Sequence, residues 1–438
     1  MLANDLKLTQ NSYYVASANE QPNYPALETD ITVDVCVVGG GFAGLSSAIE
    51  LADLGFKVVV LEANHIGFGA SGRNGGQLIA GLACEQSVIE KALGFEAAKQ
   101  VWNMSEEALD LVRERVKRFD IKCDLTDGFL GVSVNPAKGK KLQTWFDDMQ
   151  QRYQYNAQWI EPAHIKNWID SPRYFNGYYD KRGGHIHPLN YCLGLAKGAA
   201  SLGVQIYQHT AVTGMAQGEQ VILTTPKAKV TANFVVLAGN MYLPEIAPKI
   251  APKLAKRIMP VGTYIIGTEP LNAKLAKQLM PTNAAVCDTN FDLDYFRLSA
   301  PTQTQGPRMI YGGRISYSTF TPPKIGYQLQ AHMLATFPQL KNTKVEYTWG
   351  GFVDISMNRA PDFGRITPNI YYLQGFSGHG VALTGLAGKL VAEAISNQSG
   401  RLDVFAKIKH YDFPGGKLLR TPALILGMAW YQLRDKLG

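Results

Sequence analysis

The sequence predicts an α/β fold in which a Rossmann-type domain is interleaved with an α+β domain built around an antiparallel sheet. Two strand–glycine turn–helix units, near residues 33–54 and 369–395, predict the Rossmann-type domain. Alternating stretches between residues 241 and 350, with aromatic residues on them, predict the antiparallel sheet. The 438 residues are too many for one hydrophobic core, which also favours two domains.

The first unit begins with a short apolar, β-branched run that is typical of a buried parallel strand. Gly39, Gly41 and Gly44 follow as G-x-G-x-x-G, for a tight turn, close approach of a pyrophosphate and close helix–strand packing. The next strand ends at Glu62, whose carboxylate can bind both ribose hydroxyls and would repel a 2′-phosphate. Since strand, turn, helix and acid are in register, the unit predicts FAD or NAD rather than a glycine turn without a ligand.

A second loop of small residues, 67–77, directly follows the predicted ribose-binding strand. It can be a flexible surface loop. Its position favours cofactor contact, because a backbone with so few side chains can press against a ring system. The predicted strand at 234–238 ends at Gly239, and a ligand lies at such a strand end in an open α/β sheet.

The second unit combines a strand at 369–373, a glycine-rich turn at 374–380 and a helix at 381–395. The N–H groups and dipole at that helix start suit a diphosphate or the N1–C2=O edge of a flavin. His379 lies in the turn. Elsewhere, His185 and His187 are two residues apart on an extended segment and should point to opposite faces, so no shared metal site is predicted.

Composition excludes several classes of protein. Hydrophobic content is 46%, charged content is 18% and the net charge is +7 without a basic block, so the chain is globular and is not expected to bind nucleic acid. Five scattered cysteines without C-x-x-C spacing predict neither disulfides nor a zinc site. The first twenty residues do not resemble a secretory signal, and no apolar run reaches membrane-spanning length. A cytoplasmic protein is expected.

Other segments carry simpler expectations. Residues 1–29 are polar and predict an extended arm, whereas 84–120 and 137–170 show helical patterns. The tail, 418–438, is apolar with basic flanks. It can be an interfacial membrane helix, but docking on the protein's own surface is the favoured interpretation.

The motifs at 12–14, 34–41, 66–77, 183–190, 375–380 and 413–416 together span nearly the whole chain. By them the chain resembles the FAD-dependent amine oxidoreductases of the D-amino-acid oxidase superfamily, and within it the γ-glutamylputrescine-oxidising enzymes of bacterial polyamine catabolism. The resemblance implies an FAD-binding domain formed by 30–85, 165–240 and 350–438, and a substrate domain formed by 86–164 and 241–349.

The resemblance also implies how FAD is held. Some sarcosine-oxidising relatives attach FAD through a cysteine in the segment that corresponds to 349–353, which contains none here, so non-covalent FAD is expected. The residues implied to bind FAD are Gly39, Gly41, Phe42, Ala43, Gly44, Glu62, Ala63, Gly69, Ala70, Ser71, Arg73, Asn74, Gly75, Gly76, Gln77, Val212, Gly239, Gly378, His379, Gly380, Val381 and Ala382.

The implied reaction is oxidation of a C–N bond. The neutral amine would give its α-hydrogen as a hydride to flavin N5, water would convert the imine to an aldehyde and ammonia, and oxygen would reoxidise the flavin and give hydrogen peroxide. An apolar pocket would favour the neutral amine. Tyr295, Tyr311 and Trp349 are candidates to line it, although they can equally be core residues.

Two histidines are the candidate catalytic residues. His379 is expected near the flavin edge, where a positive charge would stabilise the reduced cofactor, and His187 is expected on the substrate side. A γ-glutamyl carboxylate would need a basic partner, and Arg73, Arg297 and Arg314 remain alternatives.

Three other functions stay open. The first is an oxidase or dehydrogenase of D-amino or N-methyl amino acids. The second is an NAD-binding module that uses only the first glycine turn, and the third is a flavoprotein that holds FAD without catalysis. The identity of the amine, the electron acceptor and the oligomeric state are not determined by the sequence.

Overall fold

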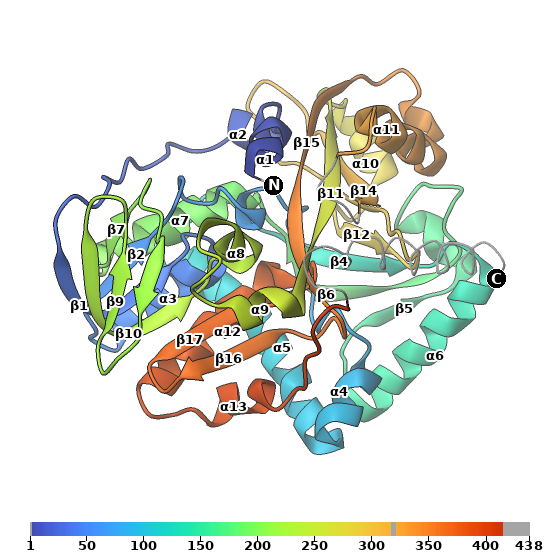
Figure 1. Cartoon of the computed structure of the whole chain (residues 1–438). Helices are drawn as coiled ribbons and strands as arrows, with labels where there is room; N and C mark the ends of the chain where they lie inside the picture. Colours follow the sequence, from blue (N-terminus) through green and yellow to red (C-terminus); the bar gives the residue numbers. More distant parts are fainter. Residues whose placement is uncertain (1, 317–320, 415–438) are drawn as a thin grey trace.

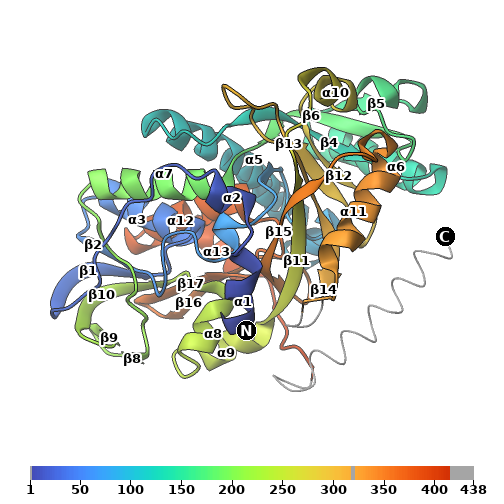
Figure 2. The same cartoon turned by 90° about the horizontal axis from the view of Figure 1, so that it is seen from above.

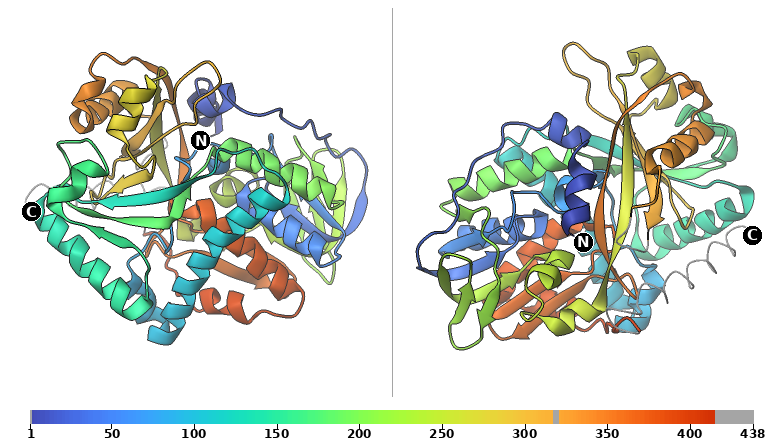
Figure 3. Two further views of the ribbon diagram at one scale, coloured as in Figure 1. Left: turned by 180° about the vertical axis from the view of Figure 1, so that it is seen from behind. Right: turned by 45° about the horizontal axis from the view of Figure 1, so that its top comes forward.

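The computed structural model describes residues 2–316 and 321–414, and the predicted tail helix at 418–438 lies outside them. The described chain contains two sheets that lie side by side, with the long strands β11 and β15 at the boundary (Figures 1 and 3). This arrangement, together with relatives of the same fold described below, confirms the predicted mixed α/β architecture.

The first sheet has a parallel centre in the order β17-β10-β1-β2-β7. The β16 strand pairs antiparallel at one edge, and a β8–β9 hairpin extends β10. Among the described residues, its eight strands are β1 (Ile31–Val38), β2 (Val58–Leu61), β7 (Gln205–Tyr207), β8 (Gly214–Ala216), β9 (Val221–Thr224), β10 (Lys229–Leu237), β16 (Asp362–Thr367) and β17 (Ile370–Gln374).

Both faces of this sheet are buried, as a parallel sheet requires. Val35 and Val37 of β1 contact the helical side, whereas Cys36 and Val38 belong to a separate core on the opposite side, which follows from the two-residue period of a strand. Figure 2 shows the helices α3 (Phe42–Asp53), α7 (Pro188–Ser201) and α12 (Gly380–Ile395) together on one side. Helix α12 packs directly on α3.

The second sheet is mainly antiparallel and follows the order β15-β11-β14-β13-β12-β4-β6-β3, with β5 beside β6. Its nine strands among the described residues are β3 (Gln77–Leu78), β4 (Thr126–Val132), β5 (Gln158–Ile160), β6 (Gly177–His185), β11 (Ile258–Thr268), β12 (Ala285–Asp288), β13 (Tyr295–Leu298), β14 (Met309–Ser316) and β15 (Val345–Ser356).

The remaining helices cover the sheets and connect them. They are α1 (Leu2–Thr9), α2 (Tyr13–Ala16), α4 (Gln86–Leu93), α5 (Phe95–Arg118), α6 (Pro136–Tyr153), α8 (Leu243–Ile246), α9 (Pro252–Arg257), α10 (Ala273–Leu279), α11 (Ile325–Thr336) and α13 (Gly400–Ala406). No helix in the described ranges is long and apolar enough to cross a bilayer.

Two expectations about single segments were wrong. The polar arm at 1–29 was expected to be extended but contains α1 and α2, because buried contacts that the sequence pattern does not show hold these helices. The segment 137–170 was expected to be helical throughout, but α6 ends at Tyr153 and the strand β5 follows. Its Gln154 adopts a left-handed conformation that ends the helix (φ 59°).

The predicted domain boundaries stay a prediction, and several elements cross them. Strands β3 and β6 were assigned to the FAD-binding domain, yet they pair within the second sheet. Helix α5 was assigned to the substrate domain, yet it packs on α12, and Arg115 of α5 donates to Ser46 and Glu50 of α3. The strand β15 itself runs across the boundary at residue 350.

Candidate active site

The first glycine turn joins β1 to α3 and depends on the missing side chains. A Cβ atom on Gly44 would lie 1.9 Å from the carbonyl oxygen of Gly39, so only glycine lets the helix pack this closely on the turn. Gly39 has a φ of 117° and its backbone approaches Ala238 of the neighbouring strand β10. The N-cap residue Gly41 has no side chain that could cap α3, so N–H groups at this helix start remain for an anion.

Glu62 follows β2 beside this turn, and its carboxylate is oriented by backbone groups. Oε2 accepts a hydrogen bond from the Gly40 N–H (2.7 Å) and Oε1 accepts one from the Asn64 N–H (2.8 Å). Burial raises the pKa of Glu62, and these backbone hydrogen bonds oppose the rise. Each oxygen retains acceptor capacity, so the carboxylate can still receive the hydroxyls of a ribose.

The loop 67–77 folds over the first turn. It contains a short 3₁₀ helix, Ala70–Gly72, and Ser71 Oγ accepts a hydrogen bond from the N–H of Phe42 at the start of α3 (3.0 Å). Asn74 braces the loop, because its side chain donates to the carbonyls of Ala70 and Ser71 and accepts from Gly76. The loop is therefore an ordered wall and not a flexible connection.

The second glycine turn joins β17 to α12. Gly375 and Gly378 have positive φ values of 76° and 85°, and the N-cap residue His379 does not cap α12 with its side chain. The buried carboxylate of Asp354, on β15, accepts a hydrogen bond from the Gly375 N–H. Burial raises the pKa of Asp354, and hydrogen bonds from Gly375, Asn240 and Phe376 oppose the rise.

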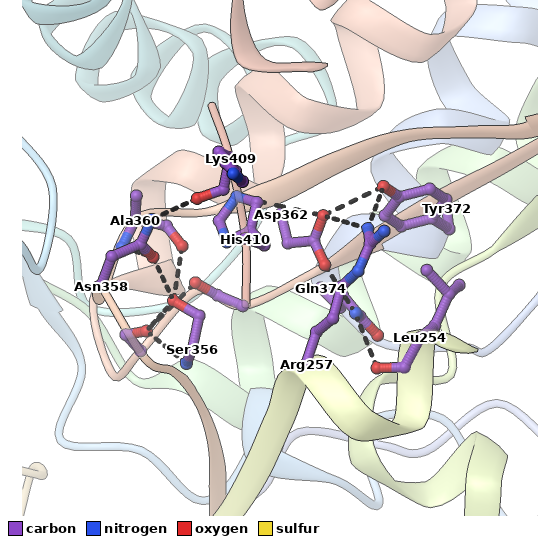
Figure 4. Close-up of polar contacts among 12 residues, drawn as sticks. Leu254, Arg257, Ser356, Asn358, Ala360, Asp362, Tyr372, Gln374, Lys409 and His410 are labelled. Atoms are coloured by element: carbon purple, nitrogen blue, oxygen red, sulfur yellow. Dashed lines mark hydrogen bonds and ion pairs between the residues drawn. The ribbon is translucent and has the colours of Figure 1, made fainter. Parts of the chain in front are cut away.

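A polar network beside the second turn holds it from the side of β16 (Figure 4). The buried carboxylate of Asp362 accepts hydrogen bonds from Tyr372 (3.0 Å) and Gln374 (2.9 Å) and lies 3.5 Å from Arg257. In the adjoining strand turn, Ser356 donates to the Ala360 carbonyl (2.7 Å). These contacts fix the strand that leads into the turn.

One cavity of about 350 Å³ joins the two glycine turns. Gly39, Gly41, Gly378 and Gly380 all line it, although the two pairs are more than 330 residues apart in the sequence. The cavity volume lies within the range of roughly 300–1,000 Å³ that is usual for ligand pockets. The glycine cradle, the oriented Glu62 and two helix starts are the features that a dinucleotide with a diphosphate needs.

Most residues that were predicted to bind FAD line this cavity. They are Gly39, Gly41, Phe42, Ala43, Glu62, Ala63, Gly69, Ala70, Ser71, Asn74, Val212, Gly239, Gly378, Gly380 and Val381. Others lie behind or beside its wall, namely Gly44, Arg73, Gly75, Gly76, Gln77, His379 and Ala382. Contact of each of these residues with FAD stays a prediction.

The two candidate catalytic histidines do not line this cavity. His379 is partly buried, its Nε2 lies 3.2 Å from the carbonyl of Ala80, and burial lowers its pKa, which favours the neutral ring. His187 is buried between Ser17 Oγ (3.1 Å) and the N–H of Asn190 (3.2 Å), and burial with the charge of Arg297 lowers its pKa to about 3. Catalytic roles for both stay predictions.

The three aromatic residues predicted to bind substrate also lie outside the cavity wall. Tyr311 is buried in the core on the other face of the second sheet, where it stacks on Phe296 and is bonded to Thr336 (2.8 Å). The indole N–H of Trp349 donates to the Arg73 carbonyl (3.1 Å), and Tyr295 packs against Gly75. Their predicted role as substrate contacts has no support from the cavity.

Several cavity residues were missed by sequence reasoning. Asp354, Tyr242 and Phe376 line the cavity. No sequence motif and no hydrophobic periodicity singled out Asp354 or Tyr242. The segment 349–353 was noted only for its lack of cysteine, yet Phe352 and Val353 are lining residues. In the described part of the chain no group of three His, Cys, Asp or Glu side chains can hold a metal ion.

Comparison with known proteins places this geometry in a family. Residues 34–394 match the model of the FAD dependent oxidoreductase family, DAO. The chain is 44% identical to the γ-glutamylputrescine oxidoreductase of Escherichia coli K12 over 433 residues, which cover 98% of this chain and 99% of that protein. It is 40% identical to the probable oxidoreductase OrdL of Haemophilus influenzae, over 97% of each chain.

Solved structures show the same fold. The glycine oxidase of Geobacillus kaustophilus superposes with a TM-score of 0.73 over 87% of this chain and 99% of its own, at 20% identity. The L-proline dehydrogenase of P. horikoshii gives a TM-score of 0.69 over 88% and 98%, at 21% identity. Since the family match covers most of the sequence and the cavity fits the cofactor, the chain belongs to the family of FAD-dependent oxidoreductases and is an FAD enzyme that acts on amines.

Proposed function

We propose that this protein oxidises the amine of γ-glutamylputrescine, or of a related polyamine derivative, to an aldehyde, ammonia and hydrogen peroxide. The observation that carries the proposal is the 44% identity to a γ-glutamylputrescine oxidoreductase over almost the entire length of both chains. Molecular oxygen is the proposed electron acceptor and the cytoplasm the proposed compartment. The five cysteines, all in the described residues and all free, are compatible with a reducing environment.

The chain's own residues would hold the cofactor at separate points. Glu62 would bind the ribose, the start of α3 would bind the diphosphate, and the start of α12 at Gly380 would face the flavin. When bound, FAD supplies the acceptor for the hydride that leaves the carbon next to the amine.

The cavity wall beside the second turn would favour a neutral amine. Apart from Asp354, the residues that line this part, Phe352, Val353 and Phe376, are apolar, and an apolar environment disfavours a charged ammonium because it removes the water that solvates the charge. The same side chains would keep bulk water away from the reacting carbon. The substrate would therefore lose its proton on entry or bind in its neutral form.

Anaerobic mixing with a panel of amines tests the proposal. γ-Glutamylputrescine should bleach the yellow flavin, and admission of air should restore the colour with one hydrogen peroxide formed per flavin reduced. Putrescine, glycine, sarcosine and D-alanine should bleach it much more slowly. Recovery of colour only with an artificial acceptor would identify a dehydrogenase, and a flavin that none of these amines bleaches would contradict the proposal.

The second candidate function is oxidation of D-amino or N-methyl amino acids. The observation that favours it is the fold shared with a glycine oxidase and the weaker sequence similarity, 24% identity, to a sarcosine oxidase β subunit of Rhizobium meliloti. Bleaching by sarcosine or D-alanine, without bleaching by γ-glutamylputrescine, would select this candidate.

The attachment of the cofactor is tested separately. We expect acid precipitation of the yellow protein to release all of its flavin into the supernatant, because no cysteine is among the residues that line the cavity. Flavin that remains in the protein pellet would show a covalent bond.

A further inference from the structure

The N-terminal arm, defined here as residues 2–16, is built into the interior of the molecule. Helix α1 lies along β15, and α2 contacts both β15 and α7 (Figures 1 and 2). The arm mixes polar and apolar residues, and it places Asp5, Tyr13 and Tyr14 in the protein interior. No part of the proposed reaction uses these residues, so their burial needs another explanation.

Asp5 connects the arm to two residues at the FAD cavity. Its side chain is fully buried, Oδ1 accepts from Nη1 of Arg73 (2.5 Å) and Oδ2 accepts from the Tyr242 hydroxyl (2.6 Å). The ring of Tyr242 lines the cavity, and the Arg73 guanidinium stacks 4.4 Å from the centre of the Phe68 ring, which also lines it. One carboxylate therefore orients two parts of the cavity wall.

Tyr14 forms a second connection to the same loop. Its hydroxyl accepts from Nη2 of the buried Arg297 (3.1 Å), and Nε of Arg297 donates to the carbonyl of Gly75 (2.8 Å). The Tyr14 ring packs edge-on against Trp349 at 5.1 Å, and the Trp349 indole donates to the Arg73 carbonyl. The arm thus holds the 67–77 loop at Arg73 and at Gly75.

Arg73 keeps one donor without a partner. Its Nη2 is buried and has no hydrogen-bond partner in the described structure, whereas Nη1 is bonded to Asp5. A buried donor is nearly always paired, so an unmatched one at a cofactor loop needs an explanation. A buried ion pair is moreover weak evidence for a purely stabilising role, since apolar residues of similar volume often stabilise as well or better.

We propose that the N-terminal arm is part of the FAD site and that Asp5 is a positioning residue, which holds Arg73 and Tyr242 in the arrangement that binds FAD. The pair fixes the Arg73 guanidinium beside the cavity wall, where its unmatched Nη2 stays available for an acceptor, and sets the position of the loop between Gly69 and Gln77. The arm therefore sets cofactor affinity, although it lies outside the strands and turns that form the nucleotide site. This inference depends on the FAD cofactor and not on the identity of the amine.

Titration of the flavin-free protein with FAD tests the inference. The Asp5→Asn variant keeps the size of the side chain but removes its charge and replaces one acceptor oxygen. It should bind FAD about tenfold more weakly, which is the effect expected when a charge-assisted hydrogen bond is lost. The stabilisation of the protein by added FAD, measured as the difference in Tm with and without the cofactor, should shrink in parallel.

A buried ion pair elsewhere gives a matched control. Asp294 is also fully buried, pairs with Arg173 (2.7 Å), directly precedes β13 and is not among the residues that line the cavity. The Asp294→Asn variant should lower Tm but bind FAD with the wild-type dissociation constant. If Asp5→Asn behaves in the same way as this control, with normal FAD affinity and an unchanged flavin absorption spectrum, the arm has only a structural role and the inference is wrong.

A milder variant keeps the test decisive if Asp5→Asn does not fold. Tyr242→Phe removes only the hydroxyl that donates to Asp5 and leaves the ring at the cavity wall. It should weaken FAD binding about threefold, the lower part of the range for one hydrogen bond. An unchanged dissociation constant in this variant would also overturn the inference. Since neither measurement uses turnover, a wrong assignment of the amine would not affect them.

Discussion

The two glycine turns border the same cavity but are held in place by different means. In the first turn the backbone itself makes the close contacts, because Gly44 packs on the Gly39 carbonyl and Gly39 packs on Ala238. In the second turn a side chain from another strand, Asp354, accepts the Gly375 N–H, and Ser377 Oγ accepts the N–H of Ser356 (3.2 Å). The first turn therefore depends mainly on missing atoms, although Glu62 and Ser71 also accept N–H groups from it, and the second depends on polar partners from β15.

The two turns should therefore be disrupted by different kinds of substitution. A close backbone contact at a glycine is lost when a Cβ atom is added, because the new atom clashes with its immediate neighbours. A turn held by buried polar groups fails when one partner is removed, because the remaining groups are left unpaired. The network around Asp362 in Figure 4 adds a further set of partners behind the second turn only.

The largest effect should come from the first turn. Gly44→Ala adds a Cβ atom 1.9 Å from the Gly39 carbonyl oxygen, so α3 must move away from the turn. We expect the free energy of unfolding to fall by about 3 kcal/mol or more and the purified protein to contain little FAD. Urea denaturation and the flavin-to-protein absorbance ratio measure these effects.

Gly400 offers the matched control for this substitution. It lies at the start of α13, and an added Cβ atom there would meet nothing within 4 Å. Gly400→Ala should change stability by no more than about 0.5 kcal/mol and leave the FAD content normal. If both variants lost stability and FAD equally, the close packing of the first turn would not explain the effect of Gly44→Ala.

The second turn should respond most to Asp354→Asn. The amide nitrogen of the new side chain would face N–H donors instead of accepting from them, so we expect a loss of about 2 kcal/mol in stability and weaker FAD binding. Asp53, which forms a partly exposed pair with Arg118 at the end of α3, is the control, and Asp53→Asn should have almost no effect. A normal FAD content in Asp354→Asn would show that the turn does not need this carboxylate.

The Asp354 carboxylate should also affect how the stability of the protein depends on pH. Burial raises the pKa of Asp354 above its ordinary value of 3.8, so the folded state binds its proton more tightly than the unfolded state does. Asp354 makes its full contribution to the free energy of unfolding when the pH is below its ordinary pKa. This contribution is lost as pH rises through the raised pKa, by at most about 1.4 kcal/mol per pH unit. Since Asp354→Asn lacks this loss, the stability gap between the variant and the wild type should narrow as pH rises from 4. A gap that widens over this range, measured by urea titrations, would contradict the assignment.

The smallest expected loss of stability comes from removing the serine hydroxyl at each turn. Ser71 supplies one hydrogen bond to the first turn, at the N–H of Phe42, whereas Ser377 bonds to both Ser356 and Gly375. We expect Ser71→Ala to cost about 0.5 kcal/mol and Ser377→Ala about twice as much, because its left-handed φ of 54° also disfavours alanine. Thermal denaturation of the flavin-free proteins measures both. A larger loss of stability in Ser71→Ala than in Ser377→Ala would contradict this expectation.

Much of the fold was accessible from local pattern. The strand–turn–helix units at β1–α3 and β17–α12 appear within one or two residues of their expected bounds. Gly55 has a positive φ of 84° just after α3, which is common for a glycine past a helix end. The second sheet was recognised in part, because β11 to β14 and the first half of β15 lie in the predicted 241–350 region, whereas β3 to β6 do not.

The candidate site was accessible only in part. Residues inside a glycine motif were named because the motif itself implies a ligand, and Val212 and Gly239 followed from the resemblance and from the end of a strand. Tyr311 and Trp349 show the limit, since an aromatic residue on an amphipathic strand has the same pattern whether it faces a ligand or a core. Asp354 and Tyr242 have no pattern at all before the chain is folded.

Local sequence was sufficient for the local conformations: the periods of strands and helices, the glycine turns and the helix starts that suit a diphosphate. These depend on the steric and hydrogen-bonding preferences of a few neighbouring residues. Only the tertiary structure decided that both turns meet at one cavity, that Asp354 secures the second of them, and that a polar N-terminal segment contributes buried Asp5. Those outcomes depend on burial, and a polar group can be buried only where partners from distant parts of the chain satisfy it.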